Sequence, residues 1–210
     1  MDIVNPQIEG YMLSLLDRYD DPVLAEMEDE AERRGFPAVG RVVGVTLEVL
    51  ARSIGARRVF ELGSGFGYSA YWFARAVGER GDVHCTENDP ENVGAGQAWL
   101  DRAGLGNQVV WHTGDALTAF GETDGEFDIV FVDIDKREYP DAWRAASERI
   151  RVGGLYICDN ALGTGSTNVL EDGEVARYIR EHNDLVARNE RWISAIIPTR
   201  EGDLVAIRIS

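Results

Sequence analysis

The stretch from Val59 to Tyr68 constrains the fold of this 210-residue chain more than any other. Val59 to Leu62 is a short apolar run of the kind that forms a buried parallel strand. Glycines follow at positions 63, 65 and 67, so the backbone can turn tightly and a ligand can approach it without meeting a Cβ atom. A helix predicted from Tyr68 to Val77 would begin with unpaired N–H groups facing that ligand. The stretch therefore predicts a strand, a glycine turn and a helix that bind a nucleotide-like cofactor.

Two acidic residues indicate which cofactor is bound. Dinucleotide sites use the pattern G-x-G-x-x-G and place a pyrophosphate on the helix N-terminus. Here the pattern is G-x-G-x-G, preceded by Glu61, whose carboxylate would repel a pyrophosphate but suits a cationic, amino-acid-bearing ligand such as S-adenosylmethionine. Glu87 follows the next predicted strand, where a carboxylate binds ribose hydroxyls in either kind of site. A glycine turn can also be only a tight turn, but the two acids together favour S-adenosylmethionine.

Two more predicted strands end in carboxylates. Residues 127–132 run into Asp133, and residues 154–158 run into Asp159 and Asn160. If these strands are neighbours, their carboxyl ends bring the three side chains to one rim of the sheet, beside the cofactor. Oxygen donors without His or Cys suit a hard cation, Mg²⁺ or Ca²⁺. The structural alternative is that Asp159 and Asn160 start a loop and that Asp133 caps a helix.

Lys136 is the one lysine in the chain, and the other 20 of its 21 Lys and Arg residues are arginines. Arginine stays protonated in proteins, whereas lysine can release its proton. The exception at position 136, close after Asp133, therefore indicates a general base or a donor that gives up its proton. A chance lysine on a solvated helix start is the alternative.

The order of elements predicts an α/β fold. Strands are expected at 57–62, 82–86, 108–112, 127–132 and 154–158, and helices at 68–78, 90–103, 115–121, 138–151 and 171–189. Residues 192–198 and 204–209 flank a turn and predict a hairpin. We therefore expect a doubly wound, Rossmann-like sheet of seven strands, mostly parallel, with an antiparallel hairpin strand at the C-terminus.

The first 54 residues predict helices that cap this sheet. Two amphipathic helices are expected within 6–35, broken near Asp20-Asp21-Pro22, and a third over 39–54. The apolar residues that carry the first helical pattern are Ile8, Met12, Leu15 and Leu16. We expect one domain over 1–210, made of a helical cap at 1–54 and a Rossmann-like core at 55–210.

Charge and composition exclude some partners. A net charge of −16 and a pI near 4.5 argue against nucleic acid, which needs a basic face, and against anionic membranes. The acidity fits a salt-adapted protein or an ordinary acidic, arginine-preferring bacterial one. No apolar run approaches the roughly 18 residues of a membrane span and no signal peptide is visible, so we expect a cytoplasmic protein. Cys85 and Cys158 are expected to be buried, reduced thiols. The three histidines look isolated and are assigned no role.

Several segments together resemble a known family. They are residues 37–40, 61–69, 86–90, 127–139 and 159–160. They resemble the cation-dependent branch of the S-adenosylmethionine-dependent O-methyltransferases, which includes catechol and caffeoyl-CoA O-methyltransferases. The resemblance runs from about Phe36 to the C-terminus, and the last two segments are its most specific part.

The resemblance implies roles for individual residues. Asp133, Asp159 and Asn160 would bind the divalent cation, and Lys136 would be the catalytic base beside Asp133. Asp115 can also be explained as a helix N-cap. The cofactor contacts expected from the resemblance and from the glycine turn are Val39, Glu61, Gly63, Ser64, Gly65, Gly67, Ser69, Glu87, Asp115, Ala116, Asp133 and Asp135.

The resemblance also implies an acceptor. We expect methyl transfer to a hydroxyl of a small catechol-like or vicinal-diol molecule. The loop at 161–166 lacks the tryptophan of plant-type members, and the acidic N-terminal helices contain no lysine, so a CoA ester is not expected. The alternatives are a hydroxyuridine of tRNA as acceptor, an NAD-binding Rossmann oxidoreductase, and a cofactor-binding protein without activity. Relatives are often homodimers, and the apolar N-terminal helices would serve that purpose.

Overall fold

The computed structural model describes residues 5–165 and 167–210. Met1 to Val4, in the predicted cap, and Ser166, in the loop predicted to border the acceptor, lie outside the described residues. In the described part of the chain no helix is long and apolar enough to cross a membrane.

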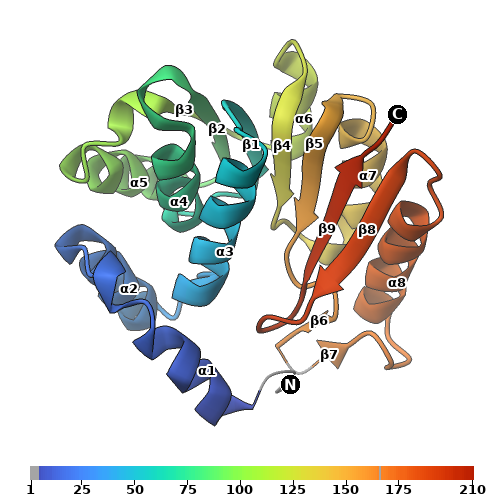
Figure 1. The fold of residues 1–210 in the computed structure, drawn as a ribbon, viewed down its shortest axis with the longest axis horizontal. Coiled ribbons are helices and arrows are strands. Elements are labelled where there is room, and N and C mark those ends of the chain that lie inside the picture. The colour runs from blue at the N-terminus through green and yellow to red at the C-terminus, as the bar shows by residue number, and fades with distance from the viewer. Residues whose placement is uncertain (1–4, 166) are drawn as a thin grey trace.

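A seven-stranded sheet forms the centre of the molecule, in the order β3-β2-β1-β4-β5-β9-β8 (Figure 1). Strands β1 to β5 are parallel, and β9 runs antiparallel to both β5 and β8. This confirms the predicted mostly parallel sheet with a C-terminal antiparallel hairpin. The bounds are β1 Arg58–Leu62, β2 Asp82–Glu87, β3 Val109–Thr113, β4 Phe127–Val132, β5 Ile150–Cys158, β8 Trp192–Ile197 and β9 Asp203–Arg208.

Helices cover both faces of the sheet and create two hydrophobic cores. Val59 and Ile129 lie in the core under α3, α4 and α5, whereas their neighbours Phe60 and Val130 lie in the core under α6, α7 and α8. Successive strand residues point to opposite faces, so each strand contributes to both cores. The bounds are α3 Gly40–Ser53, α4 Tyr68–Val77, α5 Pro90–Arg102, α6 Ala116–Glu122, α7 Tyr139–Ala146 and α8 Glu174–Ala187.

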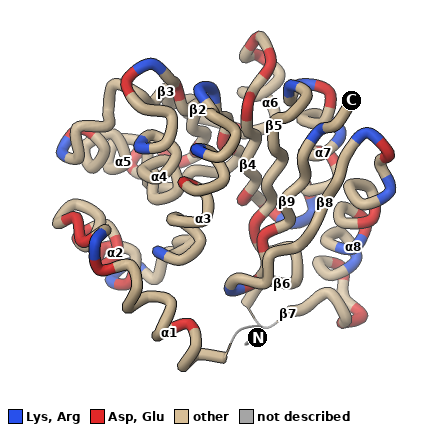
Figure 2. Tube along the Cα trace, in the orientation of Figure 1, with Lys and Arg blue, Asp and Glu red and all other residues tan. Residues whose placement is uncertain are grey.

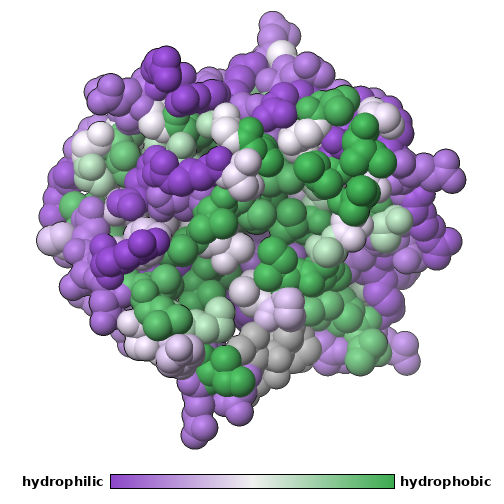
Figure 3. Space-filling view, viewed as in Figure 1, coloured by the Kyte–Doolittle hydropathy of each residue, from purple (hydrophilic) through white to green (hydrophobic). Residues whose placement is uncertain are grey.

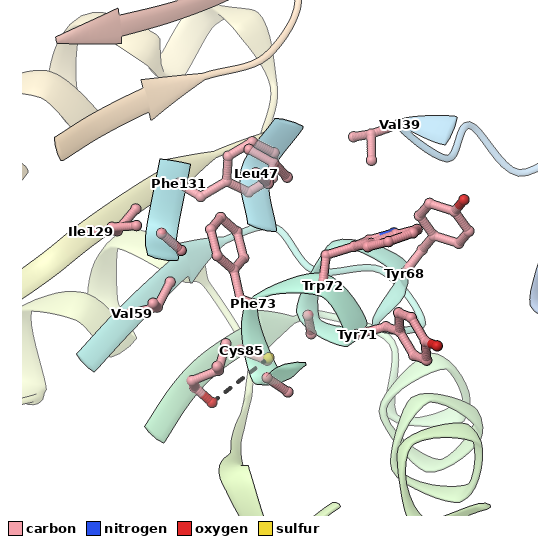
Figure 4. Packing of buried hydrophobic residues seen from close by; sticks show 14 of the residues in the cluster. Val39, Leu47, Val59, Tyr68, Tyr71, Trp72, Phe73, Cys85, Ile129 and Phe131 are labelled. Atoms are coloured by element: carbon pink, nitrogen blue, oxygen red, sulfur yellow. Dashed lines mark hydrogen bonds between the residues drawn. The ribbon is translucent and has the colours of Figure 1, made fainter. Parts of the chain in front are cut away.

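The helix that follows the glycine turn is held from both sides by aromatic packing (Figure 4). Phe73 of α4 lies against Phe131 of β4, with ring centroids 5.6 Å apart. Trp72 packs toward α3, where a Cβ atom on Gly44 would lie 2.1 Å from its indole Nε1. Because α4 is fixed in this way, the turn that precedes it is held at the sheet edge.

The N-terminal segment contains α1 (Pro6–Ser14), a 3-10 turn at Asp17–Tyr19, and α2 (Pro22–Arg34). The predicted break near Asp20-Asp21-Pro22 is correct, because the Asp21 carboxylate accepts a hydrogen bond from Val23 N at 2.8 Å and caps α2. Helix α1 differs from the prediction, since it buries no residue. Its apolar residues Ile8 and Tyr11 stay exposed, at 55% and 64%.

The boundary between α7 and β5 also differs from the prediction. Helix α7 ends at Ala146 and β5 begins at Ile150, whereas the sequence predicted a helix through residue 151. Phe127 N donates to Arg149 O at 2.8 Å, and Phe127 pairs with Ile150 in the sheet. These distant pairings extend the strand backwards into a segment whose local pattern is helical. A small hairpin of β6 (Gly163–Thr164) and β7 (Thr167–Asn168) was not predicted either.

Charges and apolar residues are distributed unevenly over the surface. Figure 2 shows acidic and basic residues concentrated on the outer helices and loops, with few on β8 and β9. In the same view apolar residues gather over α3 and the β8–β9 hairpin (Figure 3). Val49 of α3 is 57% exposed and Ile193 of β8 is 62% exposed.

Candidate active site

Three cavities meet at the carboxyl ends of the parallel strands, beside the point where the chain order reverses between β1 and β4. Their volumes are about 240, 330 and 300 Å³. Asp133, directly after β4, lines all three. We call them the turn cavity, the carboxylate cavity and the outer cavity, in that order.

The glycine turn forms the floor of the turn cavity. Gly63, Gly65 and Gly67 have φ values of 85°, 53° and 88°, in the region that favours glycine. A Cβ atom on Gly63 would lie 2.3 Å from the carbonyl oxygen of Asp133, and one on Gly65 would lie 2.6 Å from the Phe36 ring. Gly63 therefore has to be glycine both for conformation and for space, because a side chain there would meet backbone, whereas Gly65 is required mainly by its conformation.

Ser64 and Ser69 line the turn cavity, whereas Glu61 lies beneath it. Glu61 is completely buried, and its Oε2 accepts hydrogen bonds from Ser64 Oγ at 2.8 Å and Cys85 Sγ at 3.4 Å. Its other oxygen, Oε1, has no partner among the described residues. Burial, reinforced by the Asp133 carboxylate, raises the pKa of Glu61 to about 7. Glu61 is therefore a buried carboxyl group that is linked to the lining of the turn cavity through Ser64.

The outer cavity is lined by Glu87, Asp115, Ala116 and Asp135. Glu87 is the last residue of β2 rather than the first after it, and its Oε1 accepts from Asp89 N at 2.9 Å. Asp115 caps α6, and its Oδ1 accepts from Thr118 Oγ1 at 2.6 Å and from Thr118 N at 2.8 Å. These hydrogen bonds lower the pKa of Asp115. The N-cap alternative for Asp115 is thus correct, and the residue borders the cavity as well.

The carboxylate cavity brings together the residues predicted for the metal and for catalysis. Asp133, Lys136, Asp159 and Asn160 all line it. The neighbouring strands β4 and β5 end at the same edge, as the metal prediction required. Asn160 N donates to Asp159 Oδ1 at 2.7 Å, and Asn160 adopts a φ of 57°, which asparagine tolerates better than most residues.

Lys136 reaches back to the strand end from the turn after β4. Its Nζ atom donates to Asp133 Oδ1 at 3.1 Å and to the Ile134 carbonyl at 3.2 Å. The same atom lies 5.2 Å from the centre of the Tyr139 ring. The side chain is 14% exposed, so the ammonium group is confined to the cavity rather than extended into solvent.

A second buried carboxyl group lies beside Asp159. Leu204 pairs with Cys158 across the antiparallel strands β9 and β5, which places the next residues, Asp203 and Asp159, side by side. Asp203 Oδ2 accepts from Thr199 Oγ1, whereas Oδ1 has no partner among the described residues. Burial, and then the nearby Asp133 carboxylate, raises the pKa of Asp203 to about 6. Burial, followed by Asp133 and Asp203, raises the pKa of Asp159 well above its usual range.

Among the predicted site residues, Glu61 and Gly67 line none of the three cavities, and all the others line at least one. Arg200 and Asp203 were not predicted to lie here, because residues 199–203 indicate only a hairpin turn. Arg200 lines the carboxylate cavity. A signal was present, since three charged residues crowd this short turn.

The prediction that the histidines are isolated is wrong. His84 and His112 are joined by a hydrogen bond of 3.0 Å between Nδ1 and Nε2. His182 is fully buried, and its Nε2 lies 2.9 Å from the Tyr156 hydroxyl. None of the three lines a site cavity. Cys85 and Cys158 are buried free thiols, as predicted.

Comparisons with known proteins give this geometry a family. An O-methyltransferase family model matches residues 16–209. A catechol O-methyltransferase of Niastella koreensis is 32% identical over 214 residues, which cover 96% of each protein. A solved methyltransferase of Geobacter sulfurreducens superposes with a TM-score of 0.86 at 30% identity, with 100% of each chain covered. The O-methyltransferase TomG of Streptomyces achromogenes, solved with S-adenosylmethionine, gives a TM-score of 0.82 at 25% identity over 91% of each chain.

These similarities span the whole core and the predicted cofactor turn, so they do not support an NAD-binding oxidoreductase or a protein without activity. The chain belongs to the family of S-adenosylmethionine-dependent O-methyltransferases that includes the catechol O-methyltransferases.

Proposed function

We propose that this enzyme methylates one hydroxyl of a small catechol-like or vicinal-diol acceptor, with a divalent cation, Mg²⁺ or Ca²⁺, as second cofactor. The observation that carries the proposal is the carboxylate cavity, which is lined by Asp133, Lys136, Asp159 and Asn160. It adjoins the turn cavity, since Val39, Asp133 and Lys136 line both. A hydroxyl in one cavity would therefore face a methyl group presented from the other.

The donor set suits a hard cation. Asp133, Asp159 and Asn160 offer two carboxylates and an amide oxygen, the ligands that Mg²⁺ and Ca²⁺ prefer. In the described part of the chain no group of three or more His, Cys, Asp and Glu side chains is arranged for a metal, so the proposed set depends on Asn160. The raised pKa of Asp159, caused by burial and by neighbouring carboxylates, indicates excess negative charge that a cation would relieve. When bound, the cation would acidify and orient the acceptor hydroxyl.

Lys136 is the proposed proton acceptor. Its Nζ atom lies within hydrogen-bonding distance of Asp133, so a hydroxyl placed beside that carboxylate would be within reach of the lysine. Lys136 acts in its neutral amine form, after its ammonium group has released a proton to solvent. The hydroxyl oxygen forms the new bond to the methyl carbon, the bond from that carbon to sulfur breaks, and the hydroxyl proton goes to the Lys136 amine. Holding oxygen and methyl in line supplies much of the remaining acceleration.

The other predicted contacts divide between two ends of the cofactor. We propose that Ser64, Ser69 and the glycine turn hold its methionine end, supported by Glu61, and that Val39 closes over it. Glu87 would bind the ribose, and Asp115, Ala116 and Asp135 would border the adenine. The support for this division is that the first group lines the turn cavity and the second lines the outer cavity.

A small molecule fits as acceptor better than the alternatives. The carboxylate cavity of about 330 Å³ has room for one aromatic ring, and the Niastella koreensis relative is named for catechol. A tRNA or CoA acceptor would bring phosphates to a chain with a net charge of −16. The cytoplasmic location of the enzyme stays a prediction that rests on the sequence alone.

We also propose that two copies associate. The support is that α1 buries no residue and that its apolar side chains, together with Ile193 of β8, remain exposed. Sedimentation velocity at several protein concentrations tests this: a dimer that dissociates on dilution is expected, and a monomer at all concentrations would contradict it.

The acceptor is tested by incubating the enzyme with S-adenosylmethionine, Mg²⁺ and catechol, and by identifying products with mass spectrometry. The expected product is monomethylated catechol, formed in step with S-adenosylhomocysteine. The control is phenol, which has a single hydroxyl group and should react far more slowly. Equal rates with phenol, or methylation of tRNA in place of catechol, would contradict the proposal.

A further inference from the structure

Arg200 occupies an unusual position beside the proposed acceptor. It lies in the turn between β8 and β9 and lines the carboxylate cavity together with Asp133 and Lys136. Its φ of 47° makes it, with Asn160, one of two non-glycine residues with positive φ in the described chain. A residue held in this sparsely populated region indicates that the surrounding structure fixes it there.

The Arg200 guanidinium is fixed by the backbone rather than by a carboxylate. Its Nη1 donates to the Ala38 carbonyl at 2.7 Å, and a Cβ atom on Gly40 would lie 2.7 Å from the same nitrogen. The nearest carboxylate oxygen, Oε2 of Glu201, lies 3.7 Å from Nε, beyond a good hydrogen bond. Among the described residues Nη2 donates to no acceptor. The group is thus oriented in advance and still has donors to offer.

The nearby Arg41 is different. It faces the neighbouring cavity that Arg200 also borders, but its Nε and Nη2 bind the two carboxylate oxygens of Glu28 at 3.1 and 2.6 Å. Its charge is therefore already matched. Arg200, by contrast, makes no hydrogen bond to a carboxylate among the described residues, and its ion pair with Glu201 is long, at 3.7 Å.

Besides Arg200 and its neighbour Glu201, the charged residues that line the carboxylate cavity are Asp133, Lys136 and Asp159, and these three have proposed roles. Asp133 and Asp159 are proposed to hold the cation, and Lys136 to take the hydroxyl proton. Arg200 is then the positively charged residue of this cavity that has no proposed role. The chain as a whole is strongly acidic and repels anions at long range. The Arg200 guanidinium would therefore favour an acceptor whose negatively charged group lies beside it when the acceptor is bound.

We infer that Arg200 binds a carboxylate substituent of the acceptor, so that the preferred substrates are catechol carboxylic acids rather than neutral catechols. This inference rests on the proposed function. A guanidinium and a carboxylate form paired, charge-assisted hydrogen bonds. The carboxylate would lie at the Arg200 side of the cavity, and the two hydroxyls at the side of Asp133 and Lys136.

The test compares protocatechuate with its methyl ester, which keeps both hydroxyls and removes the negative charge. The variants are Arg200→Gln, Arg200→Lys and the control Arg188→Gln, whose side chain is 79% exposed and paired with Asp184 on α8. For Arg200→Gln we expect KM for protocatechuate to rise about 10- to 100-fold relative to KM for the ester. Arg200→Lys should recover part of this loss, and Arg188→Gln should behave as the wild type.

A purely structural role for Arg200, as a tie between the hairpin and Ala38, predicts equal losses for acid and ester. That result, or a wild type that does not distinguish the two, would overturn the inference.

Calorimetric titration of both probes into protein loaded with S-adenosylhomocysteine and Mg²⁺ separates this inference from the proposed function. If protocatechuate binds to the wild type and binds more weakly to Arg200→Gln, the role of Arg200 is supported. If in addition neither probe is methylated, the role of Arg200 still stands, but the proposed acceptor chemistry is wrong. Methylation of both probes without an effect of Arg200→Gln leaves the proposed function standing and refutes the role of Arg200.

Discussion

The ammonium nitrogen of Lys136 lies 3.1 Å from Oδ1 of Asp133, across the turn that follows β4. This pair joins two parts of the site, because both residues line the turn cavity and the carboxylate cavity. The sole lysine of the chain is thereby held where a methyl donor and a hydroxyl acceptor would meet. This placement supports the proposed roles, in which Asp133 binds the cation and Lys136 accepts the hydroxyl proton.

Replacing Lys136 by arginine should keep the ion pair with Asp133 but remove the proton acceptor. We expect kcat to fall at least about 100-fold, the usual contribution of a positioned general base, with little change in the affinity for S-adenosylmethionine. Steady-state kinetics and calorimetry measure the two quantities. Arg137→Lys, at the adjacent residue with its side chain 51% exposed, is the control and should leave kcat unchanged. A Lys136→Arg variant with normal kcat would show that Lys136 is not the base.

The glycine turn should not tolerate a side chain at Gly63. A Cβ atom there would lie 2.3 Å from the Asp133 carbonyl, at a φ of 85°. We expect Gly63→Ala to lower the free energy of unfolding by about 3 kcal/mol and to abolish measurable binding of S-adenosylmethionine. Urea denaturation and calorimetry provide the measurements.

The matched control for that variant is Gly121→Ala in α6, where a Cβ atom meets nothing within 4 Å. This substitution should raise the free energy of unfolding by up to about 1 kcal/mol, because alanine favours helix more than glycine does. Unimpaired cofactor binding by Gly63→Ala would contradict the placement of the cofactor in the turn.

Glu61 should make the stability of the cofactor-free protein depend on pH. Burial raises its pKa from 4.5 to about 7 in the folded state, so between these values the folded protein binds the proton more tightly than the unfolded chain. The stabilisation is complete below pH 4.5 and is lost as the pH rises through 7. The shift corresponds to about 3 kcal/mol.

Glu61→Gln removes this ionisation. Its free energy of unfolding, relative to wild type, should therefore increase by up to about 3 kcal/mol between about pH 4 and about pH 8, as measured by urea denaturation. The exposed Glu190→Gln is the control and should give a constant difference. A difference that does not change with pH for Glu61→Gln would show that Glu61 is not buried as described.

The core of this structure could be predicted from local sequence, whereas its edges could not. The strand from Phe127 to Val132 is observed with the predicted bounds, because an uninterrupted apolar run before Asp133 leaves few alternatives. The start of β5 at Ile150 depends on pairing with Phe127, which no local pattern reveals. Helix α1 has an apolar pattern, but none of its residues is buried by the described part of the chain.

In the site, too, some residues could be placed from local sequence and others could not. Asp133, Asp159 and Asn160 could be placed together because the carboxyl ends of neighbouring parallel strands share an edge. Asp203 is the first residue of the antiparallel strand β9, and Arg200 lies in the turn before it. Only the register of β9 against β5 brings both residues to that edge. Their position depends on a contact between distant parts of the chain, which is why the sequence analysis described them as a turn.

The central claim, a cation held by Asp159 and its neighbours that is required for methyl transfer, is tested by assaying catechol methylation before and after removal of divalent metal with a chelator. We predict that chelation lowers the rate at least about 100-fold, that Mg²⁺ restores it in the wild type, and that Mg²⁺ fails to restore it in Asp159→Asn, although this variant still binds S-adenosylmethionine. Methyl transfer that continues unchanged in the chelator would contradict the account.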